Sequence, residues 1–122
     1  MSILVVTGTG TGVGKTVVTA AVAALAAERG SSVAVVKLVQ TGLGATEPGD
    51  LDDVTRLSGV TDVHEFARYP SPLAPAAAAR VDRLPEPDLD SALAEIEELA
   101  AIRRLVVVEG AGGLLVLSLI HI

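Results

Sequence analysis

The sequence predicts an α/β fold of three layers, in which a parallel sheet lies between helices. Three apolar runs, at residues 3–6, 33–36 and 105–108, contain no polar residue. Such runs are typical of strands that are buried on both faces of a parallel sheet. An Ala-rich segment with helical spacing joins the first two runs. Strand, helix and strand in this order predict a right-handed crossover between parallel strands.

The first strand, over residues 3–6, leads directly into a glycine-rich loop. A helix is expected over residues 15–29, because its apolar residues recur at helical spacing and Gly30 is a natural C-cap. Residues 33–36 form the second strand. Lys37 stands at the end of this strand, which we expect to lie beside the first.

Turn residues and one helix cap mark the remaining elements. Three prolines between residues 69 and 75 predict an ordered loop or turn. Asp88 is a favourable N-cap for the helix that follows it. The expected order is a loop over residues 42–49, a short helix over 50–57, a loop over 69–75, a helical segment over 76–80, a helix from Asp88 to about residue 101, and a strand over 105–108.

Composition excludes several classes of function. The chain has 122 residues, of which 50% are hydrophobic, and this suffices for one small domain with a core. A net charge of -6 argues against nucleic acid and against an anionic membrane surface as partners. The absence of cysteine excludes disulfides, thiol catalysis and cysteine-ligated zinc. The sequence shows no basic leader and no bilayer-spanning apolar run, so we expect a cytoplasmic protein.

Residues 8–16 form a phosphate-binding loop with the sequence Gly-Thr-Gly-Thr-Gly-Val-Gly-Lys-Thr. Glycines let the backbone turn its N–H groups toward phosphate oxygens, and the N-terminus of the following helix adds partial positive charge. Lys15 would reach the β- and γ-phosphates of a nucleoside triphosphate, and the Thr16 hydroxyl would bind Mg²⁺. The predicted nucleotide-binding residues are Thr11, Gly12, Val13, Gly14, Lys15, Thr16 and Val17.

The loop departs from the standard pattern at one point. Thr9 occupies the position of the usual first glycine, and Gly8 precedes it, so the loop is one residue longer than usual. The alternative is a glycine-rich turn without a ligand, but such a turn has no need of Gly14-Lys15-Thr16 at a helix start. The same residues fail the dinucleotide-binding fingerprint, because Val13 stands where its last glycine belongs.

Polar residues at the predicted strand ends are the next candidates. Ligands of an open parallel sheet bind at the carboxyl ends of its strands. There Lys37 could face the γ-phosphate and Glu109 could organise Mg²⁺, although a solvated lysine and a surface acid are the plain alternatives. Asp50, Asp52 and Asp53 open a predicted helix, so helix capping explains them at least as well as metal binding does.

Several segments together point to one known family. They are residues 6–16 with the longer phosphate loop, Lys37-Leu38-Val39-Gln40-Thr41-Gly42, Asp50, Tyr69-Pro70-Ser71-Pro72-Leu73-Ala74-Pro75, and Val108-Glu109-Gly110-Ala111-Gly112-Gly113. In this order and spacing they resemble the dethiobiotin synthetases, and the resemblance extends to about residue 116. Leu38 stands where the family usually has proline, and Gly12 where some members have an acid. Neither departure removes a phosphate or metal contact.

The resemblance implies an α/β P-loop fold and an ATP-dependent reaction of 7,8-diaminopelargonic acid with CO₂. One amine takes up CO₂ as a carbamate, and the carbamate attacks the γ-phosphate of ATP to give a carbamic-phosphoric anhydride. The second amine then closes the ureido ring of dethiobiotin and expels phosphate. The resemblance implies that Lys15 and Lys37 are catalytic, because they stabilise the charge on the phosphoryl group and the carbamate.

The resemblance also assigns ligands and partners. The cofactors it implies are ATP and Mg²⁺, and full-length members of the family are homodimers. The implied metal ligands are Thr16, Asp50 and Glu109, of which Asp50 rests on the family alone. The implied substrate residues are Lys37, Thr41 and Leu73.

Three alternatives to this assignment stay open. The cobyrinic acid amidating synthetases share this type of loop, but they need a glutaminase domain that this chain cannot contain. Partition-type ATPases carry a lysine at the position of Gly10, so its absence counts against a dimerising switch. The plainest alternative is a nucleotide-binding fragment without activity.

The last six residues do not follow the family pattern, and family chains continue for about another hundred residues. We therefore expect residues 1–116 to be the N-terminal part of a truncated synthetase domain and residues 117–122 to be a non-native tail. The DNA sequence CTGTCTCTTATACACATC, the end of a transposon-based sequencing adapter, translates to this hexapeptide. We expect the 122-residue chain itself to be inactive.

Overall fold

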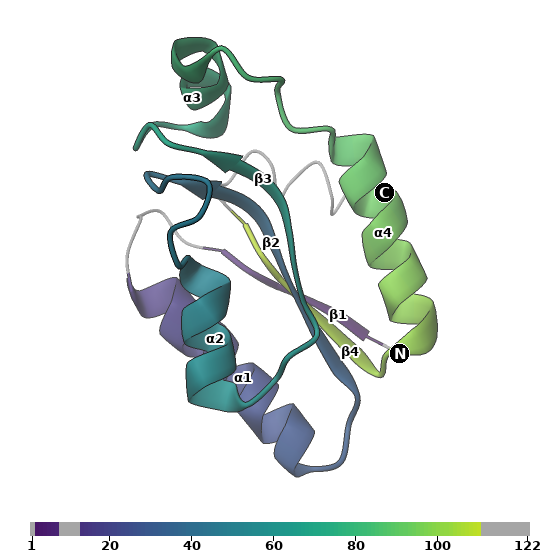
Figure 1. Ribbon diagram of the computed structural model, residues 1–122. Coiled ribbons are helices and arrows are strands. Elements are labelled where there is room, and N and C mark those ends of the chain that lie inside the picture. Colours follow the sequence, from purple (N-terminus) through teal and green to yellow (C-terminus); the bar gives the residue numbers. More distant parts are fainter. Residues whose placement is uncertain (1, 8–12, 111–122) are drawn as a thin grey trace.

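Four parallel strands form the sheet (Figure 1). The computed structural model describes residues 2–7 and 13–110. The strands are β1 (Ser2–Val6), β2 (Val33–Thr41), β3 (Val63–Tyr69) and β4 (Leu105–Glu109). The predicted parallel α/β sheet is confirmed. The expectation that the second strand lies beside the first is wrong, because the spatial order is β1-β4-β2-β3 and β4 pairs with both.

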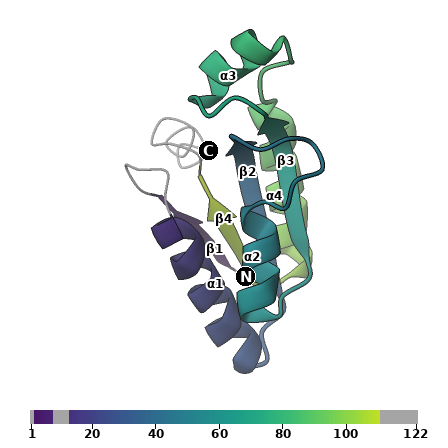
Figure 2. The same cartoon turned by 60° about the vertical axis from the view of Figure 1, so that its left-hand side comes forward.

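Helices cover both faces of the sheet (Figures 1 and 2). On one face lie α1 (Val13–Glu28) and α2 (Asp50–Ser58), and on the other lies α4 (Leu89–Ile102). The helix α3 (Pro75–Asp82) sits beyond the ends of β2 and β3. Two apolar clusters form the core, one on each side of the sheet. This is the predicted three-layer arrangement.

The helices end where the local sequence signals predict. Gly30 and Gly59 follow α1 and α2 with φ angles of 82° and 78°, a left-handed backbone that favours glycine. The Asp88 side chain accepts a hydrogen bond from the Ser91 N–H and so caps α4. Pro75 opens α3 at a position where a missing N–H does no harm. Within residues 13–110, no helix combines the length and apolar character needed to cross a membrane.

Two features of β2 and β3 differ from the sequence prediction. β2 continues through Lys37 to Thr41 instead of ending at residue 36, because β3 pairs with it along this stretch. Lys37 is therefore in the middle of a strand and not at its end. β3 is absent from the prediction, since polar and apolar residues mix in it and it has no continuous apolar run. That mixture suits an edge strand.

β1 is exposed rather than buried on both faces. In the described part of the chain it pairs only with β4, and Ile3 and Leu4 are 48% and 42% exposed. The prediction of two-sided burial is wrong for β1 and right for β4, whose residues 106–108 are fully buried. An apolar run favours burial but does not specify which neighbour covers it.

Replacing Ile96 by alanine should lower the free energy of unfolding by about 2–5 kcal/mol. Ile96 is 2% exposed and packs from α4 against the sheet, so its truncation leaves a cavity. Ile102, in the same helix, is 66% exposed and provides the matched control. Ile102→Ala should cost less than about 0.5 kcal/mol. Urea denaturation measures both variants, and equal losses would contradict the assignment of the core face of α4.

Candidate functional site

Lys37 of β2 and Glu109 of β4 are neighbours in the sheet. The register of the parallel pair sets Lys37 beside Glu109, and Val6 of β1 lies on the other side of Glu109. Lys37 Nζ is 3.1 Å from Glu109 Oε1. The two residues are 5% and 1% exposed, so water hardly screens their interaction. The alternatives of a solvated lysine and a surface acid are therefore wrong.

Asp50, the first residue of α2, places a second carboxylate on the lysine. Its Oδ2 lies 2.8 Å from Lys37 Nζ, so the ammonium group stands between two acids. Burial acts to lower the pKa of Lys37, but the hydrogen bond to Asp50 and the charges of Glu109 and Asp50 outweigh it. The pKa of Lys37 is therefore raised above its ordinary value. The side chain carries its positive charge at neutral pH.

Helix α2 is capped by Asp52 and not by Asp50. Gly49 is the N-cap residue, and its N–H donates to Asp52 Oδ2 at 2.7 Å. Asp53 pairs with Arg56 on the surface. The local sequence pattern leaves these three acids equivalent and only the family resemblance singles out Asp50, whereas the structure gives each acid a different contact. Only Asp50 faces the buried lysine.

The start of α1 reaches the same charged pair. The Thr16 hydroxyl donates to Glu109 Oε1 at 3.3 Å, and Thr16 is buried. Lys15 Nζ donates to the carbonyl oxygen of Gly110 at 3.2 Å, just past the end of β4. The end of β4 lies beside the middle of β2. There the structure brings together five predicted residues: Lys15, Thr16, Lys37, Asp50 and Glu109.

One carboxylate oxygen of Glu109 has no partner among the described residues. Its Oε1 contacts Thr16 and Lys37, whereas its Oε2 is buried without a hydrogen bond. An ionised carboxylate oxygen can only accept, and a buried one without a partner costs free energy. Oε2 is therefore a candidate ligand for a cation.

A metal ion at this place would have an incomplete shell of protein ligands. In residues 2–7 and 13–110, no group of three or more His, Cys, Asp or Glu side chains could hold a metal ion. Thr16 contacts Glu109 directly, and Asp50 shares the Lys37 ammonium group with Glu109. Mg²⁺ commonly takes one or two carboxylates and completes its shell with water and phosphate oxygens. This donor set fits Mg²⁺ bound together with a nucleotide.

The predicted substrate residues lie at the end of β2 and in the loop before α3. Thr41 ends β2 and is half-buried, and Leu73 is exposed in the loop before α3. The Gly42 N–H donates to the Tyr69 carbonyl at 3.0 Å, which joins the ends of β2 and β3. Thr41 and Leu73 are therefore near one another in the fold, but they are not part of the network around Lys37.

The nucleotide-binding prediction falls only partly on described residues. Thr11 and Gly12 lie outside them. Val13, Gly14 and Val17 lie in the first two turns of α1, which is a helix of 16 residues. The predicted strand and helix on the two sides of the phosphate loop are thus confirmed. The contacts of this loop with a nucleotide stay a prediction.

Sequence reasoning misses Gln40 and Arg68. Gln40 is buried in β2, and its Oε1 accepts the Asp50 N–H at 2.9 Å. Arg68 of β3 donates to the carbonyl oxygens of Gly44 and Glu47, in the loop before α2. A glutamine within an apolar strand is a detectable signal, because a buried amide needs a partner. Arg68 gives no such signal, since β3 itself is not predicted.

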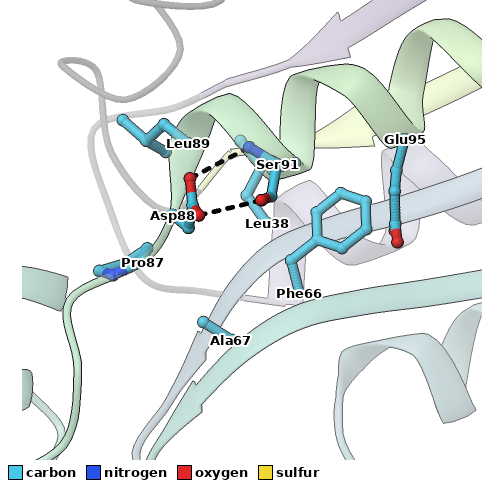
Figure 3. Close-up of a pocket in the computed structure, with 9 residues that line it drawn as sticks. Leu38, Phe66, Ala67, Pro87, Asp88, Leu89, Ser91 and Glu95 are labelled. Atoms are coloured by element: carbon cyan, nitrogen blue, oxygen red, sulfur yellow. Dashed lines mark hydrogen bonds between the residues drawn. The ribbon is translucent and has the colours of Figure 1, made fainter.

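A separate hollow of about 190 Å³ lies between α4 and the sheet (Figure 3). Leu38, Phe66 and Ala67 of the strands line it, together with residues at the start of α4. Two hydrogen bonds between Asp88 and Ser91 at its rim belong to the helix cap. None of the described residues predicted for the site lines this hollow, so we place the candidate site at Lys37 and Glu109.

Comparison with known proteins relates the chain to one family. A family model described as an AAA domain matches residues 2–120. A protein of Parafrankia sp. is 65% identical over 116 residues, which cover 95% of this chain and 49% of that protein. The corresponding values are 65%, 95% and 49% for a protein of Frankia casuarinae and 61%, 95% and 50% for one of Rhodococcus jostii.

All three relatives are named ATP-dependent dethiobiotin synthetase. They confirm the resemblance that the sequence motifs indicate. The chain spans about half the length of the curated relatives it matches.

Lys37→Met should lower the free energy of unfolding by about 3–5 kcal/mol, because it leaves Glu109 buried and without its cation. Adding Glu109→Gln to this variant should restore part of that loss, since no uncompensated buried charge remains. Arg29→Met, which removes an exposed cation after α1, is the control and should change stability by less than about 0.5 kcal/mol. Urea denaturation of the unmodified protein, both single variants Lys37→Met and Glu109→Gln, and the double variant measures the coupling. Strict additivity of the two substitutions would contradict a direct interaction of Lys37 with Glu109.

Proposed function

We propose that this chain, which belongs to the AAA domain family, is part of an ATP-dependent dethiobiotin synthetase. The observation that carries the proposal is a second lysine, the buried Lys37, whose Nζ lies 3.1 Å from the same Glu109 oxygen that Thr16 contacts. Transfer of a phosphoryl group to a carbamate is favoured by positive charge beside both reacting groups, because each of them is negatively charged. Lys15 and Lys37 would supply it. The names of relatives with 61–65% identity support the same conclusion.

ATP is proposed to bind with its phosphates against residues 11–17. Backbone N–H groups and the N-terminus of α1 attract phosphate oxygens there, and Lys15 would contact the β- and γ-phosphates. Thr16, Asp50 and Glu109 would hold Mg²⁺, which when bound neutralises phosphate charge. The buried Oε2 of Glu109, which has no hydrogen-bond partner in residues 2–7 and 13–110, supports this ligand set.

The proposed reaction joins CO₂ to 7,8-diaminopelargonic acid and closes a ureido ring. One amine attacks CO₂ and loses a proton, which gives a carbamate. A carbamate oxygen attacks the γ-phosphorus of ATP, and ADP leaves, so that a carbamic-phosphoric anhydride forms. The second amine attacks the carbonyl carbon, loses a proton and expels phosphate. The products are dethiobiotin, ADP and phosphate.

Lys37 is proposed to stabilise negative charge and not to accept a proton. Its raised pKa keeps the ammonium group charged at neutral pH. Because the group is buried, its field acts on a reacting carbamate or phosphoryl group with little screening by water. Asp50 and Glu109 fix the direction of Nζ before the substrates arrive. Thr41 and Leu73 would line the diamine site.

We also propose that the whole enzyme is a cytoplasmic homodimer without nucleic-acid or membrane partners. The net charge of -6 supports the second part of this proposal. The division into a synthetase part, residues 1–116, and a non-native tail, residues 117–122, stays a prediction. The source DNA through and beyond codon 116 tests it. A native gene that encodes the hexapeptide followed by a stop codon would contradict it.

The polypeptide encoded by the complete source reading frame should form dethiobiotin from the diamine, CO₂ and ATP. Mass spectrometry of the product, with ADP release measured in parallel, tests this. Chelation of Mg²⁺ should abolish turnover. We expect no turnover from the 122-residue chain assayed alone. Absence of dethiobiotin from the complete protein would overturn the proposed function.

In that complete protein, Lys37→Met should lower kcat by about 10²–10³-fold, because it removes a preorganised charge from the reacting groups. Arg29 is an exposed cation that directly follows the C-terminus of α1, at the opposite end from the phosphate loop. Arg29→Met should therefore leave kcat unchanged. Steady-state rates of dethiobiotin formation give both values. Similar kcat values for Lys37→Met and the unmodified enzyme would exclude a catalytic role for Lys37.

A further inference from the structure

The contact of Asp50 with Lys37 needs support from elsewhere in the fold. The Asp50 side chain is 32% exposed, and ion pairs that water can reach are individually weak. The eight residues between β2 and Asp50, 42–49, form neither a helix nor a strand, and three of them are glycines. Such a segment has many accessible conformations when nothing holds it. Contacts from β2 and β3 therefore decide where Asp50 lies.

Gln40 holds the first residue of α2. Its Oε1 accepts the Asp50 N–H at 2.9 Å, and Gln40 is itself buried. The first N–H groups of a helix have no partner within the helix. Gln40 therefore satisfies a group that would otherwise depend on water, and it does so three residues after Lys37 on the same strand. One strand thus contacts both the backbone and the carboxylate of Asp50.

Arg68 holds the loop that leads to Asp50. Its Nη1 donates to the carbonyl oxygens of Gly44 and Glu47, and Glu65 binds the other side of the guanidinium group at 2.7 and 2.9 Å. The planar guanidinium group suits such simultaneous contacts. Glu65 therefore orients Arg68 toward the loop.

Gly49 fits closely against both side chains. A methyl group at this position would lie 2.6 Å from Arg68 Nη2 and 2.9 Å from Gln40 Oε1. Any larger residue would push on these two groups. Gly49 is thus enclosed by Gln40 and Arg68, which also bind the start of α2 and the loop before it.

We propose that Gln40 and Arg68 are positioning residues, which clamp residues 44–49 and so hold the Asp50 carboxylate against Lys37. Without the clamp, Asp50 turns toward solvent and Lys37 keeps only Glu109 as its anion. The ammonium group then moves from its place between the two acids. The consequence for turnover rests on the proposed function, whereas the clamp itself is a property of the fold.

Amide hydrogen exchange tests the clamp independently of any reaction. In the protein encoded by the complete reading frame, Gln40→Leu should speed exchange of the Asp50 amide about tenfold, because this N–H loses its acceptor. Gly49→Ala should act in the same direction by displacing Gln40 and Arg68. Leu57→Ala is the control, since Leu57 is 50% exposed near the other end of α2 and contacts none of the clamped residues through a hydrogen bond. It should leave exchange at Asp50 unchanged.

Steady-state kinetics test whether the clamp acts through Asp50. Gln40→Leu and Gly49→Ala should lower kcat by about tenfold or more, as loss of supporting contacts around a ligand commonly does. KM for ATP should rise in the same variants, because Asp50 is also a proposed ligand of the Mg²⁺ that binds with ATP. In an Asp50→Asn background, Gln40→Leu should have no further effect on kcat.

The two measurements separate the clamp from the proposed function. Unchanged exchange of the Asp50 amide in both Gln40→Leu and Gly49→Ala would overturn the clamp. Full additivity of Gln40→Leu and Asp50→Asn in kcat would overturn its action through Asp50. If the unmodified protein makes no dethiobiotin, the proposed function fails, and faster exchange in the two variants would still support the clamp.

Discussion

The ion pair between Lys37 and Glu109 joins the two central strands of the sheet, and the other polar contacts of the site depend on it. A buried lysine and a buried glutamate are each unfavourable unless they are paired with good geometry. The parallel register of β2 and β4 sets the two residues side by side, and their side chains meet at 3.1 Å. Only strands that are adjacent can supply this contact. The placement of β4 between β1 and β2 is therefore what makes the charged site possible.

The other polar groups depend on this pair in a definite order. Glu109 fixes Thr16 at the start of α1, so the phosphate loop is tied to the end of β4. Lys37 attracts Asp50 from α2, so a fourth element contributes to the site after β2, β4 and α1. Gln40 and Arg68 of the edge strand β3 contact the helix start and the loop that carry Asp50. The charged centre is thus supported by an amide and a guanidinium group that are themselves outside the reacting groups.

The distribution of burial in the sheet explains where the chemistry is located. β4 and β2 are buried along almost their whole length, whereas β1 and β3 lie at the edges within the described residues. Polar groups buried between central strands lose water, which strengthens their electrostatic interactions. The site therefore forms near the ends of the central strands, beneath the helix start that follows the phosphate loop.

Local spacing in the sequence determined three strands, the helix boundaries, the phosphate loop and its lysine, because turn residues, caps and periodicity act over a few residues. The motifs also indicated Lys37, Asp50 and Glu109. The tertiary structure decided the strand order, the exposure of β1, the existence of β3 and the extension of β2 through Lys37. It also separated Asp50 from Asp52 and brought in Gln40 and Arg68. These features depend on pairing between residues far apart in the chain, which local patterns do not encode.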